Sequence, residues 1–186
     1  MRHIGFGFLL FLLSLAVYAE DAVWDQLRAG GYVLLMRHAQ TVAGIGDPPG
    51  YTLEDCKTQR NLSEEGRAQA RRTGAAFRVR RIVLTEVRSS AWCRCVDTAR
   101  LAFGNSTVWP PLNSFFDAPE RKDAQTAEVL ALARSVRPPQ NLMLVTHQVN
   151  ITALTGESVA SGEIFVAKRA ETPGERLVVV GRLKVR

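Results

Sequence analysis

An apolar run that stops abruptly at two basic residues is the feature of this sequence that most constrains its fold. Residues 32–36 read Tyr-Val-Leu-Leu-Met, without glycine or proline, which predicts a buried strand. Arg37 and His38 follow directly. In an open sheet of parallel strands, ligands bind beyond the carboxyl ends of the strands, where side chains on a rigid support reach solvent. We therefore expect Arg37 and His38 to face a ligand.

A second apolar run, residues 141–146, repeats the pattern and ends on His147. The chain has three histidines, and His3 falls in a leader that we expect to be removed. Both remaining histidines thus sit at the ends of predicted buried strands. A single histidine in such a place often only packs against its neighbours. Two of them favour a shared functional site.

The first 19 residues have the pattern of a secretory signal peptide. Arg2 and His3 precede an apolar stretch, residues 4–17, and Ala19 supplies the small residue of a cleavage site. The stretch is shorter than the roughly 20 residues that cross a bilayer, so we expect cleavage, with an uncleaved anchor as the alternative. Residues 20–186 are then a single domain, periplasmic or secreted, without stable membrane insertion.

The formal net charge of +6 falls to +5 once Arg2 is removed with the leader, and it suits anionic partners in general. The chain does not carry the aromatic platforms of a nucleic-acid-binding surface. Phe77 is the only aromatic residue among the densest arginines, so we interpret these as a solvated helix face, with a polyanion contact as the alternative: Arg71, Arg72, Arg78, Arg80 and Arg81.

Strand and helix patterns alternate along the rest of the chain. Their order predicts a three-layer α/β/α sandwich with a mostly parallel central sheet and an antiparallel edge late in the chain. The expected elements are a helix capped by Ser63, a strand at 82–85, a helix capped by Ser90 and ending near Phe103, a short strand at 107–109, helices at 122–135 and 150–154, and strands at 163–167 and 177–180.

Arg94 falls in the first turn of the helix that Ser90 is expected to cap, again beyond the carboxyl end of a strand. A guanidinium group there can direct a planar, permanently charged fork at a phosphate near the helix N-terminus. We therefore expect Arg94 to bind the same anionic ligand as Arg37.

Taken together, these residues resemble the histidine phosphatase superfamily, which includes the phosphoglycerate mutases and many phosphatases. The resemblance implies a phosphoglycerate mutase-like fold, and within the family it is nearest to small exported members such as phosphatases of lipopolysaccharide core heptoses. The matching segments are Arg37-His38-Ala39-Gln40-Thr41, Asn61-Leu62-Ser63 with Gly66-Arg67, Ser89-Ser90 with Arg94 and Thr98-Ala99, and Val145-Thr146-His147.

The residues and the resemblance point to the same chemistry. A neutral imidazole is a nucleophile toward phosphorus, so His38 can accept a phosphoryl group and form a phosphohistidine that water hydrolyses. Arg37, Arg94 and a protonated His147 are expected to bind the phosphoryl oxygens. Two further polar contacts are expected from Gln40 and Thr41. Neither a metal ion nor another cofactor is expected.

The leaving group also needs a proton donor. The family places a carboxylate between the second arginine and the second histidine, and Asp117 is the expected acid, with Glu163 as the alternative. Mutase-like members carry a glutamate where this chain has Ser114, after Leu112-Asn113. The chain also has Ala39 where the family has glycine, which would strain the backbone if φ were positive there.

These features predict an exported phosphomonoesterase acting on a phosphorylated small molecule or glycan, with a sugar phosphate as the candidate substrate. A phosphomutase on the same site is disfavoured by export. A non-catalytic binder of phosphorylated sugars or other anions is the alternative, and the position of Asp117 discriminates between binder and enzyme. Specificity is expected to lie in the loops 43–59 and 113–121. Nothing in the sequence indicates the oligomeric state.

Three cysteines fit an exported protein: Cys56, Cys93 and Cys95. They allow one disulfide and one free thiol. Residues two apart on a helix point in opposite directions, so only one of Cys93 and Cys95 can pair with Cys56. A metal site shared with the histidines is disfavoured, because this cysteine spacing on a helix is poor for ligation.

Overall fold

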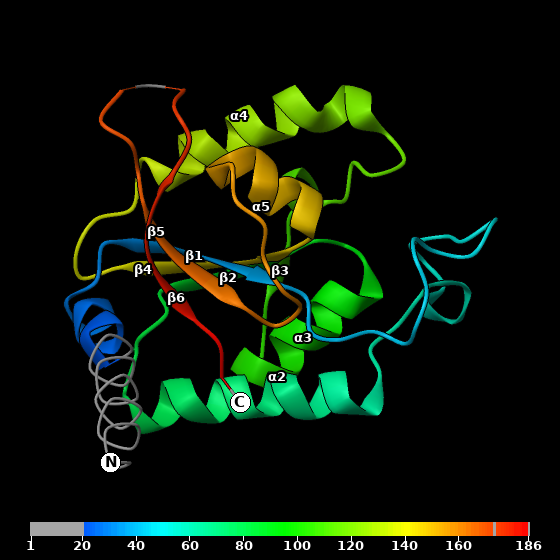
Figure 1. Ribbon diagram of the computed structural model, residues 1–186, viewed down its shortest axis with the longest axis horizontal. Helices are drawn as coiled ribbons and strands as arrows, with labels where there is room; N and C mark the ends of the chain where they lie inside the picture. Colours follow the sequence, from blue (N-terminus) through cyan, green and yellow to red (C-terminus); the bar gives the residue numbers. More distant parts are fainter. Residues whose placement is uncertain (1–20, 173, 186) are drawn as a thin grey trace, which may run out of the picture.

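The computed structural model describes residues 21–172 and 174–185, so the predicted signal peptide lies outside the described residues. A six-stranded sheet, in the order β3-β2-β4-β1-β5-β6, forms the central layer (Figure 1). Its strands are β1 (Tyr32–Arg37), β2 (Glu86–Ser89), β3 (Thr107–Val108), β4 (Asn141–Thr146), β5 (Ile164–Lys168) and β6 (Val178–Leu183).

Helices cover both faces of this sheet, with α2 and α3 on one side and α4 and α5 on the other (Figure 1). This arrangement confirms the predicted three-layer sandwich. No helix in the described part of the chain is long and apolar enough to span a membrane. The helices are α2 (Glu64–Val79), α3 (Cys93–Phe103), α4 (Lys122–Ala133) and α5 (Gln148–Thr155), with short 3-10 helices η1 (Cys56–Thr58), η2 (Pro110–Leu112) and η3 (Pro119–Arg121), and residues 21–29 are also helical.

The strand directions confirm the predicted mixed sheet. β1 pairs in parallel with β4, β4 with β2, and β2 with β3, whereas β5 runs antiparallel to both β1 and β6. β1 is apolar throughout because both of its faces are covered. Leu34 and Met36 pack toward α2 and α3, while Val33 and Leu35 pack toward α4 and α5.

Helix α2 begins as predicted, because the Ser63 hydroxyl accepts a hydrogen bond from the Gly66 amide at 3.0 Å. Two glycines let this helix approach its neighbours closely. A Cβ atom on Gly66 would lie 1.8 Å from the Gln40 carbonyl oxygen, and one on Gly74 would lie 2.0 Å from that of Ala102. α2 thereby holds the segment that follows His38 and also packs against α3.

Two local predictions were wrong. Residues 82–85 are not a strand, because the amide of Ile82 still bonds to the Phe77 carbonyl of α2, at 3.0 Å, and pairing with β4 starts at Glu86. Ser90 does not cap α3, which begins at Cys93 after Trp92 and has no side-chain cap.

Candidate active site

His38 and His147 meet at one edge of the sheet. β1 and β4 are adjacent and parallel, with Arg37 opposite Thr146, so the residues that follow these two strands are brought together. The two imidazole centroids are 5.5 Å apart and the rings are inclined by 65°. Both side chains are buried and line one cavity.

The ring of His38 is held in one tautomer by the backbone of the next residue, Ala39. Its Nδ1 lies 2.9 Å from the Ala39 carbonyl oxygen, which can only accept, so Nδ1 carries the proton and Nε2 keeps a lone pair. Burial, together with the charges of Arg94, Arg37 and Arg60, lowers the pKa of His38 to about 3 against the opposing effect of the Ala39 hydrogen bond. His38 is therefore a neutral imidazole near neutral pH.

Alanine at position 39 is compatible with this arrangement. Arg81 is the only non-glycine residue with positive φ within residues 21–172 and 174–185, so Ala39 needs no glycine-like conformation. Its side chain is buried against Leu62 and Ala70, and its amide donates to the Thr98 hydroxyl at 3.0 Å. The strain considered for this position is absent.

Four guanidinium groups line the cavity, and those of Arg37, Arg60 and Arg94 lower the pKa of both histidines. Arg37 donates to the Gln148 side chain at 2.8 Å and to the Val159 carbonyl at 3.1 Å. The Nε atoms of Arg37 and Arg94 are buried and have no hydrogen-bond partner in the described chain. Buried donors without partners are costly, and guanidinium groups whose hydrogen bonds are incomplete are suited to bind an anion.

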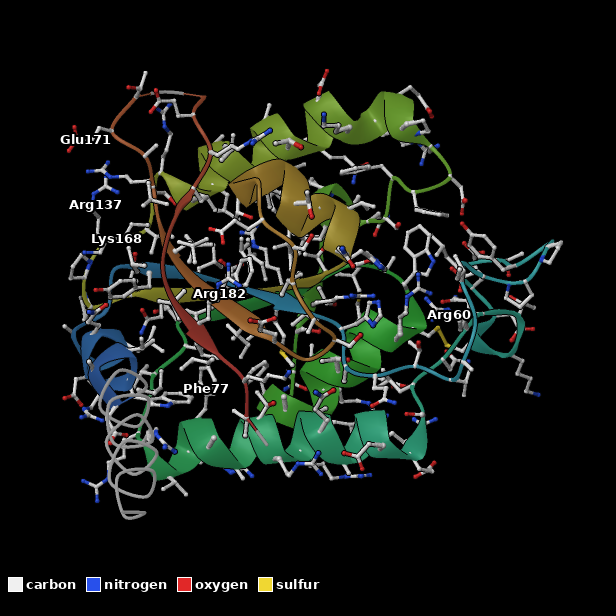
Figure 2. All side chains as sticks on the ribbon, viewed as in Figure 1. Arg60, Phe77, Arg137, Lys168, Glu171 and Arg182 are labelled. Atoms are coloured by element: carbon white, nitrogen blue, oxygen red, sulfur yellow. A yellow bond between two sulfur atoms is a disulfide. The ribbon has the colours of Figure 1, made fainter. Side chains whose placement is uncertain are left out.

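Arg60 was not anticipated from the sequence. It comes from the loop between β1 and α2, and its side chain donates to the Gly46 carbonyl at 2.7 Å and to the Thr41 hydroxyl at 2.5 Å. Figure 2 shows Arg60 at the end of the sheet where this loop leaves β1, whereas Arg137 and Lys168 lie at the opposite end.

Asp47, which sequence reasoning also missed, holds Arg94 in place. The two carboxylate oxygens lie 2.7 and 3.0 Å from Nη1 of Arg94. Asp47 also accepts hydrogen bonds from the Trp92 indole and from the Arg60 amide, both at 2.9 Å. Burial by itself would raise the pKa of Asp47, but the hydrogen bonds from Arg94, Arg60 and Trp92 outweigh it and lower the pKa. Asp47 is therefore ionised.

His147 differs from the expectation of a protonated ring. Its Nε2 lies 2.8 Å from the Ser90 hydroxyl and 3.5 Å from the Cys95 sulfur. Burial lowers the pKa of His147 well below its usual value, and the neighbouring His38, Arg94, Arg37 and Arg60 lower it further. The ring is thus neutral in this environment. A phosphoryl dianion beside it would oppose these effects, because a nearby negative charge favours the protonated form.

Asp117 lines the same cavity as His38, whereas the alternative acid does not. Asp117 is exposed at the cavity rim. The pKa of Tyr51 is raised first by burial and second by the charge of Asp117. Glu163 instead accepts a hydrogen bond from the Ala160 amide at 2.8 Å. The geometry therefore favours Asp117 as the proton donor.

Gln40 and Thr41 do not line the cavity, contrary to expectation. The backbone of Gln40 is bonded to the Gln69 side chain and to the Ser63 amide, which ties this segment to α2. The Thr41 hydroxyl accepts from Arg60, so Thr41 reaches the cavity only through that arginine.

The cavity has a volume of about 690 Å³, much more than a phosphoryl group fills. Both loops expected to set specificity contribute to it, through Ile45 and Asp47 on one side and Phe115 to Asp117 on the other. Lys122, Thr152, Ser158 and Arg176 add polar groups to its wall. The site can therefore hold a sizeable leaving group with both apolar and hydroxyl-bearing surface.

The cysteine pairing left open by the sequence is Cys56 with Cys93, with Cα atoms 5.7 Å apart. Cys95 is free and buried, and burial raises the pKa of its thiol to about 12. The disulfide joins the loop that carries Asp47 and Arg60 to the residue before Arg94. Within the described residues, no cluster of three or more His, Cys, Asp or Glu side chains could hold a metal ion.

Comparison with known proteins agrees with this geometry. Residues 33–114 match the family model of the histidine phosphatase superfamily (branch 1). A comparison with curated protein sequences gives no significant match.

Solved structures share the fold at low sequence identity. SixA from Agrobacterium tumefaciens is 20% identical over 83% of this chain and 98% of its own, with a TM-score of 0.55. Rv3214 from Mycobacterium tuberculosis is 18% identical over 81% of this chain and 96% of its own, with a TM-score of 0.58. The protein histidine phosphatase SixA complexed with tungstate is 15% identical over 82% of this chain and 96% of its own, with a TM-score of 0.56. The family match spans β1, α2, α3 and η2, and these likenesses show that the chain shares its fold with the solved structures.

Proposed function

We propose that this protein is an exported phosphomonoesterase that works through a phosphohistidine on His38. The observation that carries the proposal is the free Nε2 lone pair of a neutral His38 inside a cavity lined by four guanidinium groups. Such a nitrogen is available for attack, and the cations favour binding of the dianionic ester. The match of residues 33–114 to the histidine phosphatase superfamily model independently supports phosphatase chemistry.

In the first step, His38 Nε2 donates its lone pair to phosphorus and the bond from phosphorus to the leaving oxygen breaks. Asp117, protonated for this step, gives its proton to the leaving oxygen, so that an alcohol and not an alkoxide departs. Arg37, Arg60 and Arg94 neutralise charge on the three phosphoryl oxygens. Arg94 can hold its orientation throughout because Asp47 binds its Nη1.

In the second step, the Asp117 carboxylate takes a proton from a water molecule as the water oxygen attacks phosphorus. The bond between phosphorus and Nε2 breaks, and the electron pair returns to His38. Inorganic phosphate leaves, and Asp117 is again protonated. The protein ends in the form in which it began, with no metal ion or redox partner consumed.

The size and walls of the cavity support a substrate larger than a simple phosphate, and a sugar or glycan phosphate has the required mixture of hydroxyl and apolar surface. The disulfide supports export, since disulfides persist in oxidising compartments. The competing function is non-catalytic anion binding. The presence of Asp117 in the cavity that holds His38 favours the enzyme, because a binder has no use for an acid there.

The test is release of phosphate from an aryl phosphate in the presence of a chelator. We expect turnover by the wild type and none above background by His38→Ala. Vanadate binding is measured on both proteins, which separates the two functions. Tight vanadate binding by the wild type without turnover of aryl, sugar or glycan phosphates would overturn the proposal in favour of anion binding.

A further inference from the structure

The hydroxyl group of Ser90 is fully buried and lies among three polar partners. His147 Nε2 is 2.8 Å from the hydroxyl oxygen, and Asn113 Oδ1 is 3.3 Å from it. The amide of Trp92 donates to the same oxygen at 3.3 Å. Ser90 was predicted to cap a helix, so this contact with the second histidine gives it a different role.

The distances indicate the direction of these bonds. The oxygen of Ser90 accepts from the Trp92 amide, and its single proton can go to His147 Nε2, to Asn113 Oδ1 or to the Cys95 sulfur. The distance to His147 is the shorter by half an ångström. Oδ1 of Asn113 also accepts from the Ala91 amide at 2.8 Å. A neutral His147 therefore receives the hydroxyl proton at Nε2 and carries its own proton on Nδ1.

Asn113 is itself held firmly as the second acceptor. Its backbone carbonyl accepts from the side-chain amides of Gln125 at 2.8 Å and Asn150 at 2.9 Å. Its own amide donates to Pro110 at 2.8 Å. If His147 gains a proton, Nε2–H can donate to the Ser90 oxygen while the hydroxyl proton turns to Asn113. The ring then keeps its place in both protonation states.

Cys95 also lies near Nε2, but it is the weaker partner. Its sulfur is 3.5 Å from that nitrogen and 3.7 Å from the Thr146 carbonyl oxygen, which can take the thiol proton. A thiol is a poor hydrogen-bond donor compared with a hydroxyl. The hydroxyl of Ser90 is thus the group that determines which ring nitrogen of His147 is protonated.

We propose that Ser90, supported by Asn113, is a positioning residue that keeps the Nδ1–H of His147 available to the phosphoryl group. Nδ1 has no hydrogen-bond partner in the described part of the chain, and His147 lines the cavity. The effect on turnover rests on the proposed phosphatase activity, whereas the tautomer of His147 does not. The two can therefore be tested separately.

The test combines nitrogen NMR of ¹⁵N-histidine-labelled protein with steady-state kinetics. His147 signals are assigned as those missing from a His147→Asn variant. In the wild type we expect Nδ1 protonated and Nε2 unprotonated. Ser90→Ala should populate both tautomers and lower kcat/KM by about tenfold, the size of one lost hydrogen bond. Ser90→Thr retains the hydroxyl and should retain the wild-type tautomer.

Ser89→Ala is the matched control, because Ser89 is equally buried but bonds to Ser106, at 3.2 Å, and does not line the cavity. It should change neither readout. A wild-type His147 protonated on Nε2 would overturn the proposal even if no variant folds. An unchanged tautomer in Ser90→Ala would overturn it too. Scrambled tautomers with unchanged kcat/KM in an active enzyme would refute the role in turnover, and a wholly inactive wild type would instead refute the proposed function.

Discussion

Asp47 and Arg94 form the most buried ion pair among residues 21–172 and 174–185, with 3% and 5% of their side chains exposed. The pair joins a loop rich in glycine and proline to the first turn of α3, directly at the cavity. Asp47 fixes one end of the guanidinium group, and Nε of Arg94 is left without a protein partner. A buried carboxylate thus orients an arginine that lines the cavity and that we propose binds the phosphate.

Replacing Asp47 with alanine should destabilise the protein and weaken substrate binding. Removal of one partner leaves the charge of Arg94 buried and uncompensated, so we expect the free energy of unfolding to fall by about 3 to 5 kcal/mol. We also expect KM to rise more than kcat falls. Urea denaturation and steady-state kinetics measure the two effects.

Asp97→Ala is the control, since Asp97 pairs with Arg67 and Arg100 at more exposed positions. Asp97→Ala should lower the free energy of unfolding by no more than about 1 kcal/mol. An equal fall in the free energy of unfolding in the two variants would show that the buried pair of Asp47 with Arg94 stabilises the protein no more than an exposed pair does.

Asp117→Asn should slow turnover according to the leaving group. For alkyl phosphates, whose alkoxide needs a proton, we expect kcat to fall by about 10² to 10⁴. For an aryl phosphate with a good leaving group the first step should change little. Glu163→Gln, which alters a carboxylate outside the cavity, should match the wild type on both substrates. The rate of His38 phosphorylation is measured as well, because Asp117 also acts in the second step. An equal loss in that rate on both substrates would argue against proton donation to the leaving group.

Loss of the disulfide should affect both stability and the site. The two cysteines are 37 residues apart, and closing a loop of this length stabilises by about 4 kcal/mol in the chain-entropy model. We expect Cys56→Ser to lower the free energy of unfolding by about 2 to 4 kcal/mol. KM should rise as well, because the loop that carries Asp47 and Arg60 loses its link to Cys93. An unchanged KM in the folded variant would show that the loop keeps its place without the disulfide.

Acidic pH should destabilise the protein through its buried histidines. The pKa of His38 is about 3 in the folded protein against an ordinary value of 6.5, so between these values the unfolded chain binds more protons. Stability contributed by neutral His38 is present above about pH 6.5 and is lost as the pH falls toward 3. His147 acts in the same direction.

Two pH units below 6.5, the neutral state of His38 alone should lower the free energy of unfolding by about 3 kcal/mol. Urea midpoints at about pH 7.5 and about pH 4.5 measure the loss, and it should be smaller in His38→Asn, which cannot gain the proton. A loss of equal size in the variant would exclude His38 as its source.

Those parts of the site that lie at strand ends could be predicted from the sequence. The edge of a parallel sheet is set by apolar runs that are visible along the chain, so Arg37, His38 and His147 were placed correctly beside one another. Arg94 was also placed correctly in the first turn of α3, although the cap expected for that helix was wrong. The apolar character of residues 82–84 led to the wrong prediction of a strand, because Ile82 packs in the core where the chain still bonds to the end of α2.

Asp47 and Arg60 could not be predicted, because their positions depend on contacts between segments far apart in the sequence. The loop takes its path from the disulfide to Cys93, the hydrogen bond of Trp92 and the ion pair with Arg94. A single carboxylate inside a loop rich in glycine and proline was the only available signal. The neutral state of His147 in the absence of phosphate could not be predicted for a similar reason, since its burial follows from packing by Trp92 and Cys95.

The most direct test of the account is to identify the phosphorylated residue during turnover. The protein is mixed with an aryl phosphate, quenched in denaturant at alkaline pH, and analysed by mass spectrometry of its peptides. The phosphohistidine mechanism predicts a phosphoryl group on His38 that is lost in acid and is absent from His38→Ala. Steady hydrolysis by the wild type with no phosphoryl group on His38, or with one on His147, would contradict it.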